Sequence, residues 1–87
     1  AEVMRAQYSV HISNVCELIM AECLAISLYG NEQEAENAVN ATYALVRLES
    51  DYRSRISHVE PGMKAKVYFN KLISDFNKDI QDITERL

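Results

Sequence analysis

Glycine and proline are scarce in this chain, and their positions divide it. The 87 residues contain two glycines and one proline, which occur only at Gly30 and at Pro61-Gly62. This scarcity excludes a glycine-rich phosphate-binding loop and leaves only two strong breakpoints in the chain. The breakpoints separate three segments of similar length, each with the apolar spacing of an α-helix. We therefore predict one domain, residues 1–87, with helices over approximately 3–29, 31–58 and 61–87.

Cysteine and histidine are also few, which bears on metal and redox chemistry. Cys16 and Cys23 are seven residues apart on one predicted helix. That spacing puts them on one face but about 10 Å apart, too far for a disulfide. His11 and His58 fall on different helices and outside any metal-ligand motif. We expect no metal and no cofactor, and we interpret the cysteines as buried thiols in a reducing, cytoplasmic compartment.

The balance of charge disfavours two large classes of partner. The formal net charge is -4, whereas general nucleic-acid binding normally needs a basic surface. The longest apolar-rich stretch, Val15 to Tyr29, contains two glutamates and is shorter than a bilayer span requires. We therefore expect nucleic-acid binding to be disfavoured and predict no membrane span.

Each segment has an apolar face that predicts an antiparallel, up-down-up, all-α three-helix bundle with short turns. The predicted core positions are Met4, Tyr8, Ile12, Val15, Ile19, Cys23 and Ile26 in the first helix, Ala38, Ala41, Thr42, Leu45, Leu48, Tyr52, Ile56 and Val59 in the second, and Phe69, Leu72, Ile73, Phe76, Ile80, Ile83 and Leu87 in the third.

The residues at the breakpoints predict how the helices begin and end. Gly30 suits a left-handed position at the end of the first helix. Asn31 and Glu34 have the spacing of a capping box at the start of the second helix. Pro61 suits the first turn of the third helix, where its missing N–H has no helical partner to lose.

The first segment is apolar around nearly its whole circumference. Two neighbouring helices do not readily cover that much apolar surface. The large apolar residues outside its predicted core stripe are the predicted interface: Val10, Leu18, Met20, Leu24 and Leu28. We interpret this excess as a protein-binding surface of a small adaptor, regulator or assembly subunit that self-associates through this helix or binds a partner. The alternative is that the other two helices flank the first widely and leave some leucines exposed.

A second candidate site lies at the turn between the second and third helices. Cationic side chains gather there in the predicted bundle: Arg53, Arg55, His58, Lys64 and Lys66. The hypothesis is that this basic tip binds an anion, a nucleic acid or an acidic partner. The alternative is an uneven but ordinary soluble surface.

Arg53 and His58, with four residues between them, also form a weak enzymatic pattern. The pattern resembles the arginine–histidine signature of the all-helical HEPN ribonucleases over six residues. The resemblance implies that Arg53 and His58 would act on an RNA phosphate as charge-stabilising and acid–base groups. Apart from this pattern, the sequence predicts no enzymatic activity and no catalytic residue.

Overall fold

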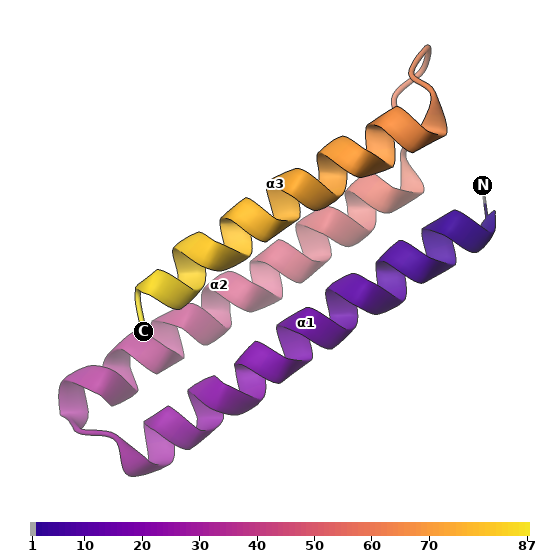
Figure 1. The fold of residues 1–87 in the computed structure, drawn as a ribbon. Coiled ribbons are helices and arrows are strands. Elements are labelled where there is room, and N and C mark those ends of the chain that lie inside the picture. The colour runs from indigo at the N-terminus through magenta and orange to yellow at the C-terminus, as the bar shows by residue number, and fades with distance from the viewer. Residues whose placement is uncertain (1) are drawn as a thin grey trace.

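The computed structural model describes residues 2–87 and is an antiparallel bundle of three helices. These are α1 (Glu2–Tyr29), α2 (Glu32–Ser57) and α3 (Ala65–Glu85). Successive helices run in opposite directions, so α1 and α3 point one way along the bundle and α2 points the other, as Figure 1 shows. The predicted all-α, up-down-up fold class is therefore confirmed.

The connection between α1 and α2 is a tight two-residue turn at Gly30 and Asn31. The Asn31 side chain accepts a hydrogen bond from the Glu34 N–H at 2.8 Å, and the Glu34 carboxylate accepts one from the Asn31 N–H at 3.0 Å. This confirms the predicted capping box, which satisfies amide groups that a helix start leaves unpaired. We call this end of the bundle the hairpin end.

Gly30 is required for a different reason from the predicted one. Its backbone is not left-handed, since Gly62 is the only residue with positive φ among those described. A Cβ on Gly30 would instead lie 2.7 Å from the Ile26 carbonyl oxygen and 3.0 Å from the Glu34 Cβ. The turn needs glycine because two helix ends crowd against its Cα, not because of its conformation.

The third helix starts later than predicted. Pro61 lies in a β-turn before the helix, in which the Glu60 carbonyl accepts a hydrogen bond from the Met63 N–H at 3.3 Å. Gly62 follows it with φ of 84°. Proline then glycine at the two central positions is the pattern of a type II turn. The predicted start at Pro61 was wrong because this turn takes up the residues before Ala65.

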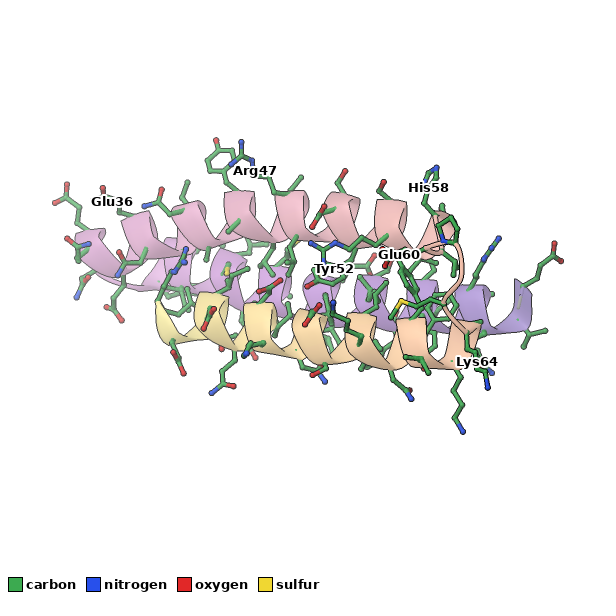
Figure 2. All side chains as sticks on the ribbon, turned by 90° about the horizontal axis from the view of Figure 1, so that it is seen from above. Glu36, Arg47, Tyr52, His58, Glu60 and Lys64 are labelled. Atoms are coloured by element: carbon green, nitrogen blue, oxygen red, sulfur yellow. The ribbon has the colours of Figure 1, made fainter. Side chains whose placement is uncertain are left out.

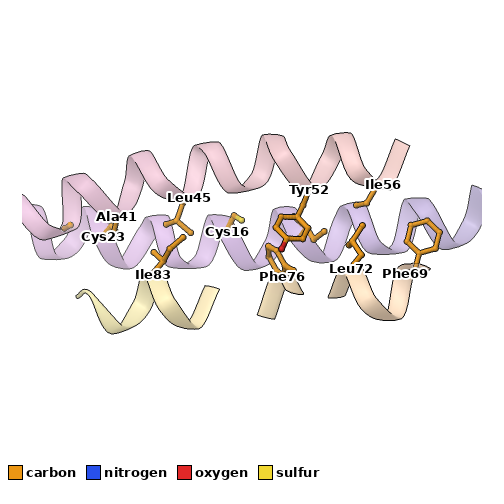
Figure 3. Close-up of a cluster of buried hydrophobic side chains, with 12 residues drawn as sticks. Cys16, Cys23, Ala41, Leu45, Tyr52, Ile56, Phe69, Leu72, Phe76 and Ile83 are labelled. Carbon is orange, nitrogen blue, oxygen red and sulfur yellow. The ribbon is translucent and has the colours of Figure 1, made fainter. Parts of the chain in front are cut away.

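The core is one apolar cluster that runs along the bundle (Figure 3), and its members match the predicted faces. The buried residues are Ile12, Cys16, Cys23, Ala38, Ala41, Leu45, Tyr52, Ile56, Phe69, Leu72, Phe76 and Ile83. The backbones of α1 and α2 approach each other more closely than those of α2 and α3. The small side chains of Ala38 and Ala41 allow this approach beside the second half of α1.

The three helices differ in length, and this sets what is exposed. α1 has 28 residues and α3 has 21. α3 ends where Arg86 lies beside Asn37, Asn40 and Ala41 of α2. The hairpin end therefore projects beyond the C-terminus, as Figure 1 shows.

Candidate protein-interaction surface

The second half of α1 exposes a continuous apolar surface. Leu18, Leu24 and Leu28 are 69%, 60% and 66% exposed. Ala21 and Ala25 are exposed between them. We call these five residues the outer α1 surface. The clustering matters more than any one residue, because single exposed leucines are common on soluble proteins whereas contiguous patches mark interaction sites.

A shallow groove continues this surface onto α2. The groove has a volume of about 290 Å³. Of the five residues of the outer α1 surface, Leu24 lines it. The other lining residues are Met20, Cys23, Ser27, Val39, Thr42 and Tyr43. Met20, predicted as an exposed anchor, is instead half-buried and packs against the core. It lines the groove but is less exposed than Leu24, so its contribution to a contact would be smaller than that of Leu24.

Sequence reasoning missed the apolar residues that α2 adds to this region. Val39, Tyr43 and Val46 are exposed large side chains on α2. Val39 and Tyr43 face Leu24 across the groove. The available signal was the position of Val39 and Tyr43 outside the main apolar face of the second segment. Their neighbours on α1 depend on the pairing of the two helices, which periodicity alone does not give.

Val10 lies apart from the other predicted anchors. It is 59% exposed on the first half of α1, where its neighbours are Ala6, Gln7, His11 and Asn14. These neighbours are mostly polar, so Val10 is a lone apolar contact point. The structure therefore brings Leu18, Leu24 and Leu28 together but separates Val10 from them.

The exposure of α1 also changes the assessment of a membrane span. The whole 28-residue helix is long and apolar enough to cross a bilayer by length and composition, unlike the stretch from Val15 to Tyr29 taken alone, so the absence of a membrane span stays a prediction. Only 22% of its most apolar 18-residue stretch is buried in the bundle. A helix in the core of a soluble protein is mostly buried, whereas most of this apolar stretch of α1 is not.

The two arginines of the basic turn point to different sides of the bundle. Arg53 is 3.2 Å from the Glu49 carboxylate and donates a hydrogen bond to Ser13 Oγ of α1 at 2.9 Å. Arg55 is 3.1 Å from the Asp51 carboxylate and lies over the Tyr52 ring. Each arginine is engaged by an acid on its own helix, which reduces the positive potential that the turn presents.

The remaining cations of the turn are also dispersed. His58 and Lys64 extend away from the bundle on opposite sides of the view in Figure 2. Both are exposed, as is Lys66. His58 Nδ1 lies 2.9 Å from the Ser54 carbonyl oxygen, so its ring is tied to its own helix. In this arrangement the five cations surround the turn without lining a common cavity.

A small cavity beside this turn is organised around Tyr68. Its hydroxyl donates toward the carbonyls of Arg55 at 2.8 Å and His58 at 3.1 Å, and so satisfies acceptors at the end of α2. Arg55 and Tyr68 line the cavity of about 230 Å³ together with Glu60, Met63, Lys71, Leu72 and Asp75. Arg53 and His58, the pair with the ribonuclease-like spacing, are not among the lining residues.

The two cysteines are buried and unpaired, as predicted. Burial raises the pKa of the Cys16 thiol to about 11, and the nearby Glu49 carboxylate adds to the effect. A thiol held protonated in this way is a poor nucleophile and a poor metal ligand. Within residues 2–87, no three His, Cys, Asp or Glu side chains are grouped closely enough to hold a metal ion.

Comparison with known proteins adds no further constraint. No family model, curated protein or solved structure matches this chain.

Proposed function

We propose that this protein is a small helical assembly or adaptor protein that binds protein partners through the outer α1 surface and the adjoining groove. The observation that carries the proposal is the contiguous exposure of Leu18, Leu24 and Leu28, each about two-thirds exposed. Large apolar side chains at the centre of a patch contribute most of the binding energy at protein interfaces. Leu24 is central here because it lies on α1 and also borders the groove.

The form of the surface supports a helical or similarly convex partner. The groove between α1 and α2 is shallow and open, with Val39 and Tyr43 on its far side. An exposed tyrosine beside aliphatic residues is typical of interface composition, since its ring is apolar and its hydroxyl is polar. Small-molecule sites, by contrast, are enclosed clefts that bury most of their ligand.

The basic turn has less support as the main binding site. Arg53 and Arg55 already have acidic neighbours at 3.2 and 3.1 Å. A site for an anion would require these pairs to break or the anion to compete with them. We therefore place the primary interaction on α1.

The proposal predicts that charge on the outer α1 surface abolishes partner binding without unfolding the bundle. The test variant is Leu24→Glu with Leu28→Glu, because both side chains are exposed and neither is in the core cluster. Affinity-tagged wild type and variant would be used to capture partners from cells that make the protein, with quantitative mass spectrometry as the readout. Partners captured by wild type should fall at least tenfold with the variant, since burying an unpaired carboxylate in an apolar interface is costly.

Val67→Glu is the matched control, because Val67 is an exposed apolar residue on α3, away from the proposed surface. It should capture the same partners as wild type. Circular dichroism should show equal helicity in all three proteins. Equal capture by wild type and by the α1 variant would refute the proposal.

A further inference from the structure

We infer that the outer α1 surface binds a second copy of this chain, with the two α1 helices side by side and antiparallel along their whole length. This inference rests on the proposed function and names its partner. It requires a surface that fits a helix, a reason for one orientation, and enough contact area for a stable dimer.

The outer α1 surface has the spacing of a helix-pairing seam. Leu18, Ala21, Ala25 and Leu28 are separated by three, four and three residues, and all four are exposed. This is the spacing of the positions that meet in coiled coils. Small residues between the two leucines let a second backbone come close, as the alanines of α2 do inside the bundle.

Charge on the bundle favours the antiparallel orientation. Glu22, Glu32 and Glu36 are exposed at or near the hairpin end. Lys64 and Lys66 are exposed at the opposite end, together with Glu2 and Glu60. Figure 2 shows Glu36 and Lys64 at opposite ends of the molecule. Antiparallel copies place each acidic end beside the basic end of the other copy. Parallel copies would place the acidic ends together, which disfavours association through like-charge repulsion.

The area needed for a stable dimer favours overlap along the whole helix. A specific interface buries about 800 Å² on each partner. The apolar half of α1 offers only about half of the helix length for contact, whereas the full helix offers a contact about 42 Å long. Full overlap sets Leu28 opposite the second copy's Val3, and Ala21 opposite its Val10. This gives the isolated Val10 and the exposed Val3 apolar neighbours.

The charges on α1 argue against a membrane as the cover for this surface. The exposed charged residues of α1 are the acidic Glu2, Glu17 and Glu22, while its one arginine, Arg5, is half-buried. Helices that lie on membranes carry lysine and arginine on the polar face, because cell membranes present anionic lipids. In the antiparallel pair Glu22 lies toward the basic end of the second copy, which suits this glutamate better than an anionic membrane does.

Disulfide trapping tests the orientation. A Val3→Cys protein would be mixed with a Leu28→Cys protein and oxidised mildly, with the wild type as a control for its buried native thiols. Antiparallel full overlap predicts a disulfide-linked dimer that contains one chain of each variant, and little product from the Leu28→Cys protein alone. A dimer formed by Leu28→Cys alone would indicate parallel pairing. A dimer formed between Leu18→Cys and Leu28→Cys would indicate overlap only at the hairpin ends. Either product, or no mixed product at all, overturns the inference.

Charge exchange tests the electrostatic argument separately. Glu32→Lys with Glu36→Lys should weaken self-association at least tenfold by sedimentation equilibrium, and Lys64→Glu with Lys66→Glu should do the same. Combining all four changes in one chain should restore association, because each end again faces its opposite charge. These residues avoid Glu34, whose side chain caps α2. Failure of the combined variant to recover would contradict the antiparallel arrangement.

The proposed function and this inference can fail separately. A chain that remains monomeric but loses captured partners in the Leu24→Glu, Leu28→Glu variant keeps its function and refutes the second copy as occupant. Binding of the monomer to phosphatidylcholine–phosphatidylserine vesicles, lost in the same variant, also refutes it and assigns the surface to lipid.

Discussion

Tyr52 shows how one polar group is held within the apolar core. Its ring is fully buried and packs edge-on against Phe76, with the ring centres 5.3 Å apart. Its hydroxyl donates a hydrogen bond to the Asp79 carboxylate at 2.6 Å. The bond joins α2 to α3. It therefore ties α3 to α2 by a directional bond in addition to the apolar packing between them.

Removing this hydroxyl should destabilise the bundle. Tyr52→Phe keeps the ring but leaves the half-buried Asp79 carboxylate without its donor, so we expect the free energy of unfolding to fall by about 2 kcal/mol. Urea denaturation followed by circular dichroism measures this. Tyr43→Phe is the control, because Tyr43 is 70% exposed and its change should have no effect. Equal stability of Tyr52→Phe and wild type would show that the bond contributes nothing net.

Because the Cys16 thiol is buried, we expect the free energy of unfolding to fall in alkaline solution. Its pKa is raised from 9.0 to about 11 in the folded protein, chiefly by burial. Well below pH 9 the thiol is protonated in both states. Between pH 9 and 11 the unfolded chain releases the proton while the folded chain retains it, so the free energy of unfolding falls as pH rises. Burial and the Asp79 hydrogen bond also raise the pKa of Tyr52, which extends the loss to higher pH.

Replacing Cys16 should flatten this dependence. Urea denaturation at several pH values from about 8 to about 10.5 would compare Cys16→Ala with wild type. The readout is the slope with pH, since the cavity left by alanine lowers stability at every pH. Cys16 contributes a slope of up to about 1.4 kcal/mol per pH unit in this window. Identical slopes would mean that the thiol is not held protonated by folding.

At the scale of elements, the two glycines serve different purposes at the two turns. Gly30 lies where a Cβ would collide with Ile26 and Glu34, while its φ is ordinary. Gly62 has open space around it but a φ of 84°, which side chains other than asparagine and aspartate rarely adopt. The first position is restricted by contact and the second by conformation.

Asparagine substitutions should separate these two reasons. Gly62→Asn should remain close to wild type in stability, because asparagine tolerates the left-handed conformation. Gly30→Asn should lose about 2 kcal/mol, because any Cβ meets the same atoms and overcrowding is costly. Thermal or urea denaturation of both variants measures this. A loss of stability in Gly62→Asn together with unchanged stability in Gly30→Asn would contradict both explanations.

The sequence was sufficient to predict the helices and their core faces, but not the details of the connections. Apolar periodicity reports which side of a helix is buried, and so it identified Leu45, Tyr52 and Phe76. It does not report where a turn ends, so the β-turn at Pro61 was mistaken for helix. It also does not report which residues meet across a helix pair. Val39 and Tyr43 therefore joined the candidate site only once the α1–α2 pairing was known.

At the scale of the whole molecule, the bundle is uneven in both packing and charge. The Cα positions extend over 49 × 19 × 15 Å, and α3 covers only part of the longer hairpin made by α1 and α2. The acidic hairpin end and the basic turn lie at opposite ends of this rod. As a result, α1 has an exposed apolar side, and the bundle changes from acidic at one end of that side to basic at the other. Both are properties that an antiparallel second copy would complement.

Sedimentation equilibrium of the wild-type protein over a range of concentrations tests the central claim most directly. At low salt, we predict a concentration-dependent rise in mass to twice the 9.9 kDa of the chain. Added salt should weaken the dimer because it screens the end-to-end charge pairing. Leu24→Glu with Leu28→Glu should remain monomeric throughout. A wild-type protein that stays at 9.9 kDa at every concentration, or a dimer unaffected by the α1 substitutions, would contradict the account.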